Sequence, residues 1–271
     1  MRLSRVNLFA AASLAAAVAF PITSRPVLAQ ASSGPDFTWQ GQIAPEGWLR
    51  IKNLNGPIRV EESTSGKAEV TATKSWRRGD PKDVRFEVKK VGPNQQDVLI
   101  CALWFEDSSC DERGYHSENH GRNTGDVSVD FVVRLPKGTR VDVGTVNGAL
   151  NISGATSEVR ASTVNGGIDA TTSGGPVTAT TVNGSVVARM GTTGTQDLRF
   201  TTVNGSVTVE LPAALDADLD LSTVNGRLSS DYPMTVEGRI DPRHLRATIG
   251  RGGRQLKVST VNGSVRLVKR A

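Results

Sequence analysis

The chain has 271 residues, of which 32 are Lys or Arg and 27 are Asp or Glu, which gives a formal net charge of +5. Three basic residues and no acid lie in the first 29 positions, so the remainder carries 32 − 3 = 29 basic residues against 27 acids, a net charge of +2. Because the charges are mixed along the chain and form no basic block, they exclude a nucleic-acid-binding function. All 28 glycines follow position 29, which predicts tight turns or closely stacked backbone.

Residues 1–29 have the pattern of a signal peptide. Two arginines precede an apolar run of 13 residues from Leu8 to Phe20, and small residues permit cleavage after Ala29 or Ala31. This run is too short to span a bilayer, and no later run reaches about 18 residues. We therefore expect an exported protein, periplasmic or secreted, with no transmembrane segment in the mature chain.

The rest of the sequence predicts an all-β chain, because apolar residues alternate and helical periodicity is absent. We expect residues 30–44 to form an N-terminal tail and first strand, residues 45–143 an N-terminal β part, and residues 144–271 a repeat region. Most aromatic residues lie in the N-terminal part, which is expected to be a bulkier cap. Its predicted strands are Trp48–Leu54, Ala68–Trp76, Val84–Lys89, Val98–Trp104 and Val127–Val133.

Cys101 and Cys110 are the only two cysteines of the chain. In an oxidising compartment such a pair predicts a disulfide. A pair of metal ligands and two free thiols are the alternatives that the sequence leaves open. The eight intervening residues do not fit a zinc knuckle and do fit a loop at the edge of a strand.

A polar insertion spans residues 106–126 and contains His116, Glu118 and His120. Two histidines four residues apart can share a metal on a helix, but no helix is predicted here and the order is not that of a zinc protease. We interpret the segment as a hydrated loop, and the sequence leaves metal binding by these three residues open.

A tetrapeptide repeat dominates the chain from residue 144 onward. Thr-Val-Asn-Gly occurs six times, its asparagines step by 18, 18, 21, 21 and 37 residues, and a related Asn-Leu-Asn-Gly stands upstream. Because Asn tolerates left-handed backbone and Gly adopts it freely, we expect a sharp turn at each pair. The last step is close to two periods, which predicts a degenerate copy at Thr248-Ile249-Gly250. The predicted turn residues are Asn55, Gly56, Asn147, Gly148, Asn165, Gly166, Asn183, Gly184, Asn204, Gly205, Asn225, Gly226, Asn262 and Gly263.

Apolar residues alternate on both sides of each Asn-Gly pair, which predicts a strand before it and a strand after it. In one architecture each pair is a type I′ turn of an antiparallel β-meander of hairpins. In the other, each 18 to 21 residues form one coil of a parallel β-solenoid, and identical residues stack about 4.8 Å apart. We favour the solenoid, because stacking explains why Thr and Val recur together with the turn residues.

Asp216, Asp218 and Asp220 alternate with apolar residues, so a strand would carry the three carboxylates on one face. Such a row can bind calcium or process carbohydrate. We favour a solvated strand face, because no basic partner, histidine or glycine-rich calcium repeat accompanies the row in the sequence. Nucleophile and phosphate-loop motifs are also absent from the sequence, which predicts no catalytic residue, no cofactor and no metal site.

Three features together carry a resemblance to a known family: Asn53-Leu54-Asn55-Gly56, the strand from Val127 to Pro136, and the Thr-Val-Asn-Gly copies. On these the chain resembles the bacterial putative-adhesin family, extracytoplasmic β-strand-repeat domains of unknown function. The resemblance covers about residues 45 to 269. It implies a parallel, right-handed β-solenoid-like fold and brings no catalytic residue with it.

From these features we expect a non-enzymatic exported β-repeat protein with an adhesin-like interaction or a structural role in the envelope. Its partner would be an unknown protein or a surface polysaccharide. One alternative is a β-solenoid that binds or processes polysaccharide. Another is a periplasmic accessory to envelope-stress signalling.

Overall fold

The computed structural model describes residues 30–31, 33–116, 126–238 and 241–270, so the predicted signal peptide lies outside the described residues. This part of the chain is almost entirely β-structure, with two short 3-10 helices, η1 (Pro81–Asp83) and η2 (Pro93–Gln95). Neither described helix is long and apolar enough to cross a membrane.

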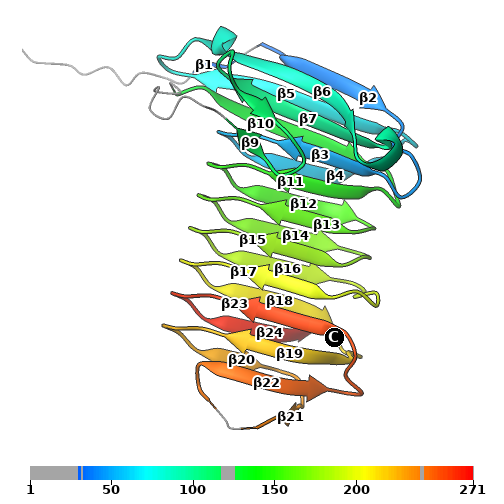
Figure 1. The fold of residues 1–271 in the computed structure, drawn as a ribbon, viewed down its shortest axis with the longest axis vertical. Coiled ribbons are helices and arrows are strands. Elements are labelled where there is room, and N and C mark those ends of the chain that lie inside the picture. Colours follow the sequence, from blue (N-terminus) through cyan, green and yellow to red (C-terminus); the bar gives the residue numbers. More distant parts are fainter. Residues whose placement is uncertain (1–29, 32, 117–125, 239–240, 271) are drawn as a thin grey trace, which may run out of the picture.

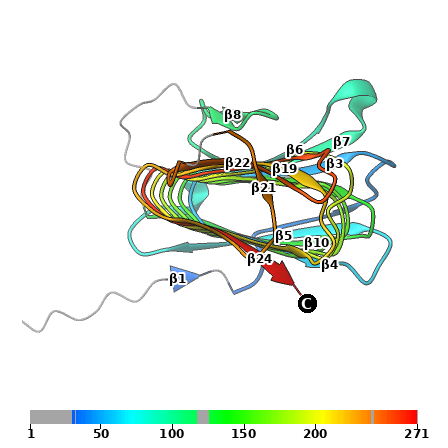
Figure 2. The same ribbon diagram turned by 90° about the horizontal axis from the view of Figure 1, so that it is seen from below.

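Two sheets of eleven strands each lie face to face along the molecule (Figures 1 and 2). Sheet A contains, in spatial order, β1 (Gln30–Ala31), β5 (Ala68–Trp76), β10 (Ser128–Leu135), β4 (Ile58–Glu62), β12 (Leu150–Ala155), β14 (Ile168–Thr172), β16 (Val186–Met190), β18 (Val207–Pro212), β24 (Val265–Arg270) and β20 (Leu228–Ser230), with β2 (Phe37–Gly41) also paired to β5. Sheet B contains β21 (Thr235–Val236), β22 (His244–Ile249), β19 (Ala217–Ser222), β23 (Gln255–Ser259), β17 (Leu198–Thr201), β15 (Val177–Thr180), β13 (Val159–Ser162), β11 (Arg140–Gly144), β3 (Trp48–Lys52), β7 (Asp97–Trp104) and β6 (Val84–Val91).

One coil of the stack consists of a strand in sheet B, a Thr-Val-Asn-Gly corner, a strand in sheet A and a link to another coil. Strands of neighbouring coils pair in parallel and in register, as Val143, Ala161 and Ala179 do. A hairpin meander would instead pair the two strands that flank each corner with one another, in antiparallel direction. The predicted parallel β-solenoid is therefore confirmed, and the meander is excluded.

The inward-facing side chains of both sheets form one continuous core. In the repeats these are small or branched residues such as Ala161, Ile168 and Val186, all 3 % exposed or less. The N-terminal part fills the same interior with larger side chains, among them the fully buried Trp104 and Phe131. Both sheets run through the predicted boundary at residue 143 without a break. In sheet B, β11 pairs with β3 on one side and with β13 on the other, and in sheet A, β12 pairs with β4 and with β14.

The polar side chains of each corner bond to the next coil. Six of the seven corner asparagines donate from Nδ2 to the asparagine Oδ1 of a neighbouring coil over 2.8 Å, and Asn55 at the end accepts, so that the side chains of all seven form one ladder. Each threonine Oγ1 donates to a glycine carbonyl of a neighbouring coil, as Thr181 does to Gly166 over 2.9 Å. The tetrapeptide recurs along the stack because identical side chains at identical positions bond to one another in neighbouring coils.

The reason predicted for the corner glycines, left-handed backbone, is wrong for most of them. None of the seven corner asparagines, all within the described residues, has a positive φ, and of the seven corner glycines Gly56 and Gly263 alone have one, of 119° and 159°. The glycines are required by close approach: a Cβ on Gly166 would lie 1.9 Å from the carbonyl oxygen of Gly148, and one on Gly184 would lie 2.0 Å from that of Gly166. The corner is tight because adjacent coils touch there, and only glycine leaves room for the neighbouring backbone.

The coils do not stack in sequence order. Asn262 lies between Asn204 and Asn225 in the ladder, and β23 and β24 lie between strands of the two coils that precede them in the chain (Figure 1). The predicted degenerate copy at Thr248-Ile249-Gly250 is therefore wrong. Its first two residues end β22, which pairs antiparallel with β19. The step of 37 residues between Asn225 and Asn262 is long because the chain forms β21 and β22 before it returns to the stack.

Antiparallel strands close the stack. At the N-terminal end, β5 and β6 run antiparallel to β10 and β7. At the other end, β22 covers β19. Such strands shield the open edges of a long sheet, which would otherwise pair with other chains.

Asp126 fixes the turn that follows β5. Its carboxylate accepts hydrogen bonds from the backbone N–H groups of Arg77, Arg78 and Gly79 over 2.8–3.1 Å. These bonds, those from Arg78 and Gly79 first, lower the pKa of Asp126 to about 2.

Because the folded-state pKa of Asp126 lies below the ordinary value of 3.8, the stabilisation is complete above pH 4 and is lost as the pH falls toward 2. We expect Asp126→Asn to be less stable than the natural chain at neutral pH, and the difference to shrink over this range. Denaturant unfolding of both chains between pH 2 and 7 measures it. A difference that is constant with pH would contradict the role assigned to this carboxylate.

Candidate functional site

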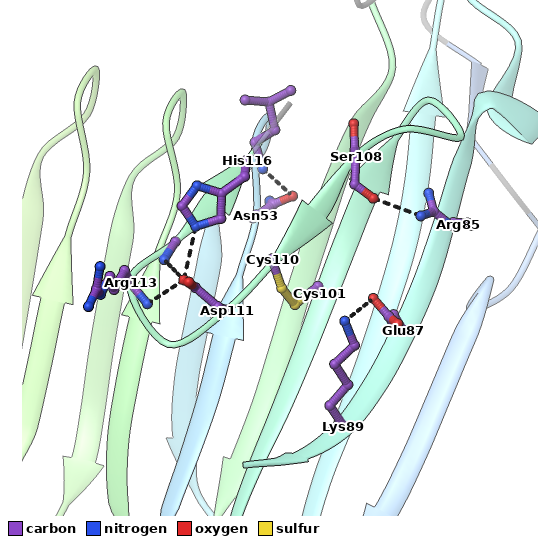
Figure 3. The surroundings of a disulfide bond; sticks show 12 residues. Asn53, Arg85, Glu87, Lys89, Cys101, Ser108, Cys110, Asp111, Arg113 and His116 are labelled. Carbon is purple, nitrogen blue, oxygen red and sulfur yellow. Dashed lines mark hydrogen bonds and ion pairs between the residues drawn. A yellow bond between two sulfur atoms is a disulfide. The ribbon is translucent and has the colours of Figure 1, made fainter. Parts of the chain in front are cut away.

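The described part of the chain departs most clearly from the coil plan in the insertion between β7 and β10. Residues 105–116 lie on the outer face of sheet B, where β8 (Ser109–Cys110) and β9 (Tyr115–His116) form a small antiparallel hairpin (Figures 2 and 3). We call the surface formed by residues 105–116, Arg140, Arg160 and Ser162 the insertion face.

The disulfide predicted from the sequence holds the insertion down. Cys101 of β7 is bonded to Cys110 of β8, with Cα atoms 6.5 Å apart (Figure 3). Around it, Leu99 and Leu103 form a second apolar cluster outside the main core, with Tyr115 packed against it. The Tyr115 hydroxyl donates to the carbonyl of Trp104 over 2.8 Å. The hairpin is therefore anchored by covalent, apolar and polar contacts.

Removal of this bond by Cys110→Ser is expected to lower stability without unfolding the solenoid, because the loop lies outside the stacked coils. The chain-entropy model gives about 2.5 kcal/mol for a closed loop of this size. Thermal melting with and without reductant measures the effect on the natural chain. Unchanged melting of both the variant and the reduced protein would contradict a stabilising role.

A buried ion network lies beneath the insertion. Arg50 donates to Asp97 over 2.8 Å and to Asp142 over 2.9 Å, and Lys52 donates to Asp142 over 2.8 Å. Asp97 also accepts from the backbone N–H of Trp48 over 3.0 Å. The four charged residues are 2–8 % exposed. Two cations and two carboxylates thus neutralise one another where water has little access.

Burial alone would lower the pKa of Arg50, but hydrogen bonds and charge from Asp97 and Asp142 outweigh it, so the pKa is raised. The guanidinium groups of Arg50, Arg140 and Arg160 surround the ring of Trp48, at 5.1, 5.8 and 4.3 Å from its centroid. Such cation–π contacts orient the arginines on the outer face of sheet B.

Sequence reasoning missed this network. Arg50 and Lys52 alternate with Leu49 and Ile51, a pattern that predicts a solvated strand face. The face is buried because an insertion more than fifty residues further along the chain folds back over it: Glu112 Oε1 lies 3.9 Å from Arg50 Nε, and Tyr115 lines a pocket together with Lys52. The only local signal is that Trp48 shares the face with the charged pair.

A pocket of about 210 Å³ adjoins the insertion, lined by residues that include Lys52, Arg113, Tyr115, Thr145 and Ser162. Arg113 is exposed, whereas Lys52 and Thr145 are buried. The pocket combines cationic and hydroxyl side chains, a composition suited to polar or anionic groups of a partner.

Of the three residues considered for a metal, His116 is described and Glu118 and His120 lie outside the described residues. The Nε2 of His116 lies 3.0 Å from Asp111 Oδ1, and this hydrogen bond is the main cause that lowers the pKa of Asp111 (Figure 3). Within the described ranges, no group of three or more side chains is arranged to hold a metal ion.

The aspartate row has partners that the sequence did not suggest. Asp216 pairs with Arg251 over 2.8 Å, and Asp220 lies 3.0 Å from His244 Nε2 and 3.4 Å from Lys257 Nζ. Asp218 and Asp220 lie on the partly exposed face of β19, opposite the buried face of Ala217 and Leu219, as the predicted strand pattern requires. The expectation that no basic or histidine partner accompanies the row is wrong. β22 returns antiparallel beside β19 and brings these groups to the row.

Asp218 accepts from the backbone N–H of Gly253 over 3.0 Å and from Thr248 Oγ1 over 3.2 Å. Asp218 and Asp220 also line an open pocket of about 430 Å³. The row fastens the neighbouring strands and loop to β19, which accounts for its three carboxylates in structural terms.

Among curated proteins, none matches this chain. Similar solved structures include a putative cell adhesion protein from Clostridium sporogenes, with 12% identity, a TM-score of 0.47, and coverage of 88% of this chain and 100% of that one. A putative adhesin from Bacteroides fragilis has 12% identity, a TM-score of 0.37 and coverage of 88% and 98%. One from Parabacteroides distasonis has 10% identity, a TM-score of 0.21 and coverage of 86% and 96%.

The family assignment rests on a family model, Toastrack DUF4097, which matches residues 117–268, more than half of the chain. The matched region takes in β10 and the coils that carry the six Thr-Val-Asn-Gly corners. The resemblance to bacterial adhesin-like repeat domains that the sequence suggested is thereby confirmed, and this chain is a member of the Toastrack DUF4097 family.

Proposed function

We propose that the protein is a non-enzymatic, exported interaction module with an adhesin-like role, and that the insertion face makes the contact. The observation that carries this proposal is the insertion itself, which is bonded to β7 by the Cys101–Cys110 disulfide. It lies over four buried charges and leaves a polar pocket at its side. A preorganised surface of this kind loses little conformational entropy when it binds.

The chemistry of the buried charges favours binding over catalysis. Asp97 and Asp142 are engaged with Arg50 and Lys52, so their oxygens are already occupied as acceptors. General bases in enzymes need an accessible oxygen or nitrogen within reach of the substrate proton. Here the network orients the surface above it, and exposed Arg113 offers a donor suited to an interface. The partner we infer is an envelope protein or surface polysaccharide.

Binding of the purified, disulfide-bonded chain to isolated cell envelopes tests the proposal. We expect saturable binding that Arg113→Glu weakens. Arg227→Glu replaces another exposed arginine, next to a corner of the repeat stack; it serves as the matched control and should bind normally. Equal binding by both variants, or binding without saturation, would refute the role of the insertion face.

Treatment of the envelopes identifies the partner. Loss of binding after protease indicates a protein, and loss after periodate oxidation indicates a polysaccharide. Release of soluble sugar from the envelope by the purified chain would contradict the non-enzymatic assignment and favour a polysaccharide-processing solenoid.

A further inference from the structure

One coil of the stack is inserted between two coils that are consecutive in the chain. This inserted coil consists of β23, the corner at residues 260–263, and β24. It separates the coil that contains Asn204 from the coil that contains Asn225. We call the space that it fills the slot (Figure 1). Until the inserted coil arrives, residues 198–230 must leave the slot open.

The link between the two slot coils is long enough to keep the slot open. Residues 213–216 connect β18 to β19. The five Cα steps from Pro212 to Ala217 reach about 17 Å when extended. The link must rise two strand spacings, about 9.6 Å, and cross about 10 Å from sheet A to sheet B, a distance of about 14 Å in all. The covalent chain therefore spans the gap without strain, and nothing in the connection requires the slot to be filled by the same molecule.

The inserted coil is held by the same bonds as every other coil. Asn262 Nδ2 donates to Asn204 Oδ1, and Asn225 Nδ2 donates to Asn262 Oδ1, each over 2.8 Å. The backbone N–H of Gly205 donates to the Asn262 carbonyl, and that of Gly263 to the Asn225 carbonyl, each over 3.0 Å. The slot recognises a strand, a Thr-Val-Asn-Gly corner and a strand, whichever molecule supplies them.

The link that leads into the inserted coil has the features of a hinge. This link, residues 250–254, joins β22 to β23, which lie on opposite sides of β19 in sheet B. It contains Gly250, Gly252 and Gly253, with φ of 60°, 70° and 118°. These are conformations that favour glycine and allow the chain direction to change. Asp216 holds the link through the Arg251 backbone N–H over 2.9 Å and its guanidinium over 2.8 Å. The hinge is thus fastened by polar bonds at the surface.

We propose that the slot is a strand-exchange site that accepts the inserted coil of a second copy of this chain. Reciprocal exchange would give a dimer in which each slot is filled by the other molecule, with the full set of ladder bonds retained. Exchange of identical elements costs little, because the contacts in the closed and exchanged forms are the same. The closed form competes through the short hinge, with an effective concentration in the millimolar range, so exchange requires folding at high local concentration.

Two full-length chains with one added cysteine each provide the test. The first carries Thr208→Cys in β18, and the second carries Arg266→Cys in β24. These positions are register partners in adjacent parallel strands, at a spacing that permits a disulfide. The chains are unfolded and refolded together at millimolar concentration and mildly acidic pH, with Cys101–Cys110 intact, and are then oxidised. We expect a covalent heterodimer on non-reducing gels that diminishes severalfold on tenfold dilution before refolding.

A matched pair controls for random collision. Val187→Cys replaces Arg266→Cys, because Val187 is also a register partner of Thr208 but lies in β16, outside the exchanged segment. This pair should give no heterodimer. Asp216→Ala in both chains releases the hinge and should raise the yield of the first pair severalfold. Absence of heterodimer in both the natural and Asp216→Ala backgrounds, or equal yields from the two cysteine pairs, would overturn the proposal.

Discussion

Gly166→Ala is expected to lower the free energy of unfolding by about 3–5 kcal/mol, at the upper end of what single substitutions do. The added Cβ would lie 1.9 Å from the carbonyl oxygen of Gly148. That oxygen already accepts a hydrogen bond from Thr163 Oγ1 over 3.0 Å, and the Gly148 N–H donates to the Asn165 carbonyl over 3.0 Å. The neighbouring backbone is held in place, so the two coils must separate at the corner.

The adjacent glycine provides the control. A Cβ on Gly167 would lie 3.4 Å from the nearest atom, the Ser185 carbonyl oxygen, which is an ordinary contact. Gly167→Ala should be neutral or stabilising by about 0.4–1 kcal/mol, because it restricts the unfolded chain. Urea unfolding of both variants measures the difference. Similar losses for the two would contradict the role assigned to close contact between coils at Gly166.

Asp142→Ala is expected to lower the free energy of unfolding by about 3–5 kcal/mol, the cost of breaking a buried ion pair by removal of one partner. The substitution leaves the Lys52 ammonium, 6% exposed in its side chain, without its carboxylate. It also removes one of the two acceptors of Arg50. The uncompensated positive charge is what destabilises the variant.

Asp169→Ala is the matched control, because Asp169 pairs with Arg189 over 2.7 Å but the two side chains are 48% and 35% exposed. Solvent screens such a pair, and its removal should cost less than about 1 kcal/mol. Replacing Asp142 and Lys52 together by Leu and Met should recover much of the loss. Denaturant unfolding of the natural chain, the two alanine variants and the double variant measures these free energies. A loss at Asp142 as small as that at Asp169 would contradict a tightly paired network.

The solenoid was predictable because its stacking repeats identical residues: Thr, Val and Asn recur where each coil meets the next. The order of the coils was not predictable for the same reason. Every coil offers the same corner bonds to its neighbours. The residues Thr260-Val261-Asn262-Gly263 therefore do not determine which two coils the inserted coil lies between. The disulfide was predicted from the signal-peptide pattern expected in the sequence and from the count of cysteines. Burial of Arg50 and Lys52 could not be foreseen, since the residues that cover them are distant in sequence.

The ends of the stack limit where the molecule can change length in evolution or by engineering. Antiparallel strands close both ends, and the inserted coil occupies a place near one of them. A unit appended after β24 would meet β19 and β20, which already occupy the next rung. Duplication of an 18-residue unit such as that from Asn165 to Asn183 meets no such obstacle, because its neighbours on both sides are successive coils. Each duplication would lengthen the molecule by about 4.8 Å. The middle of the chain is therefore where relatives of different length are expected to gain or lose repeats.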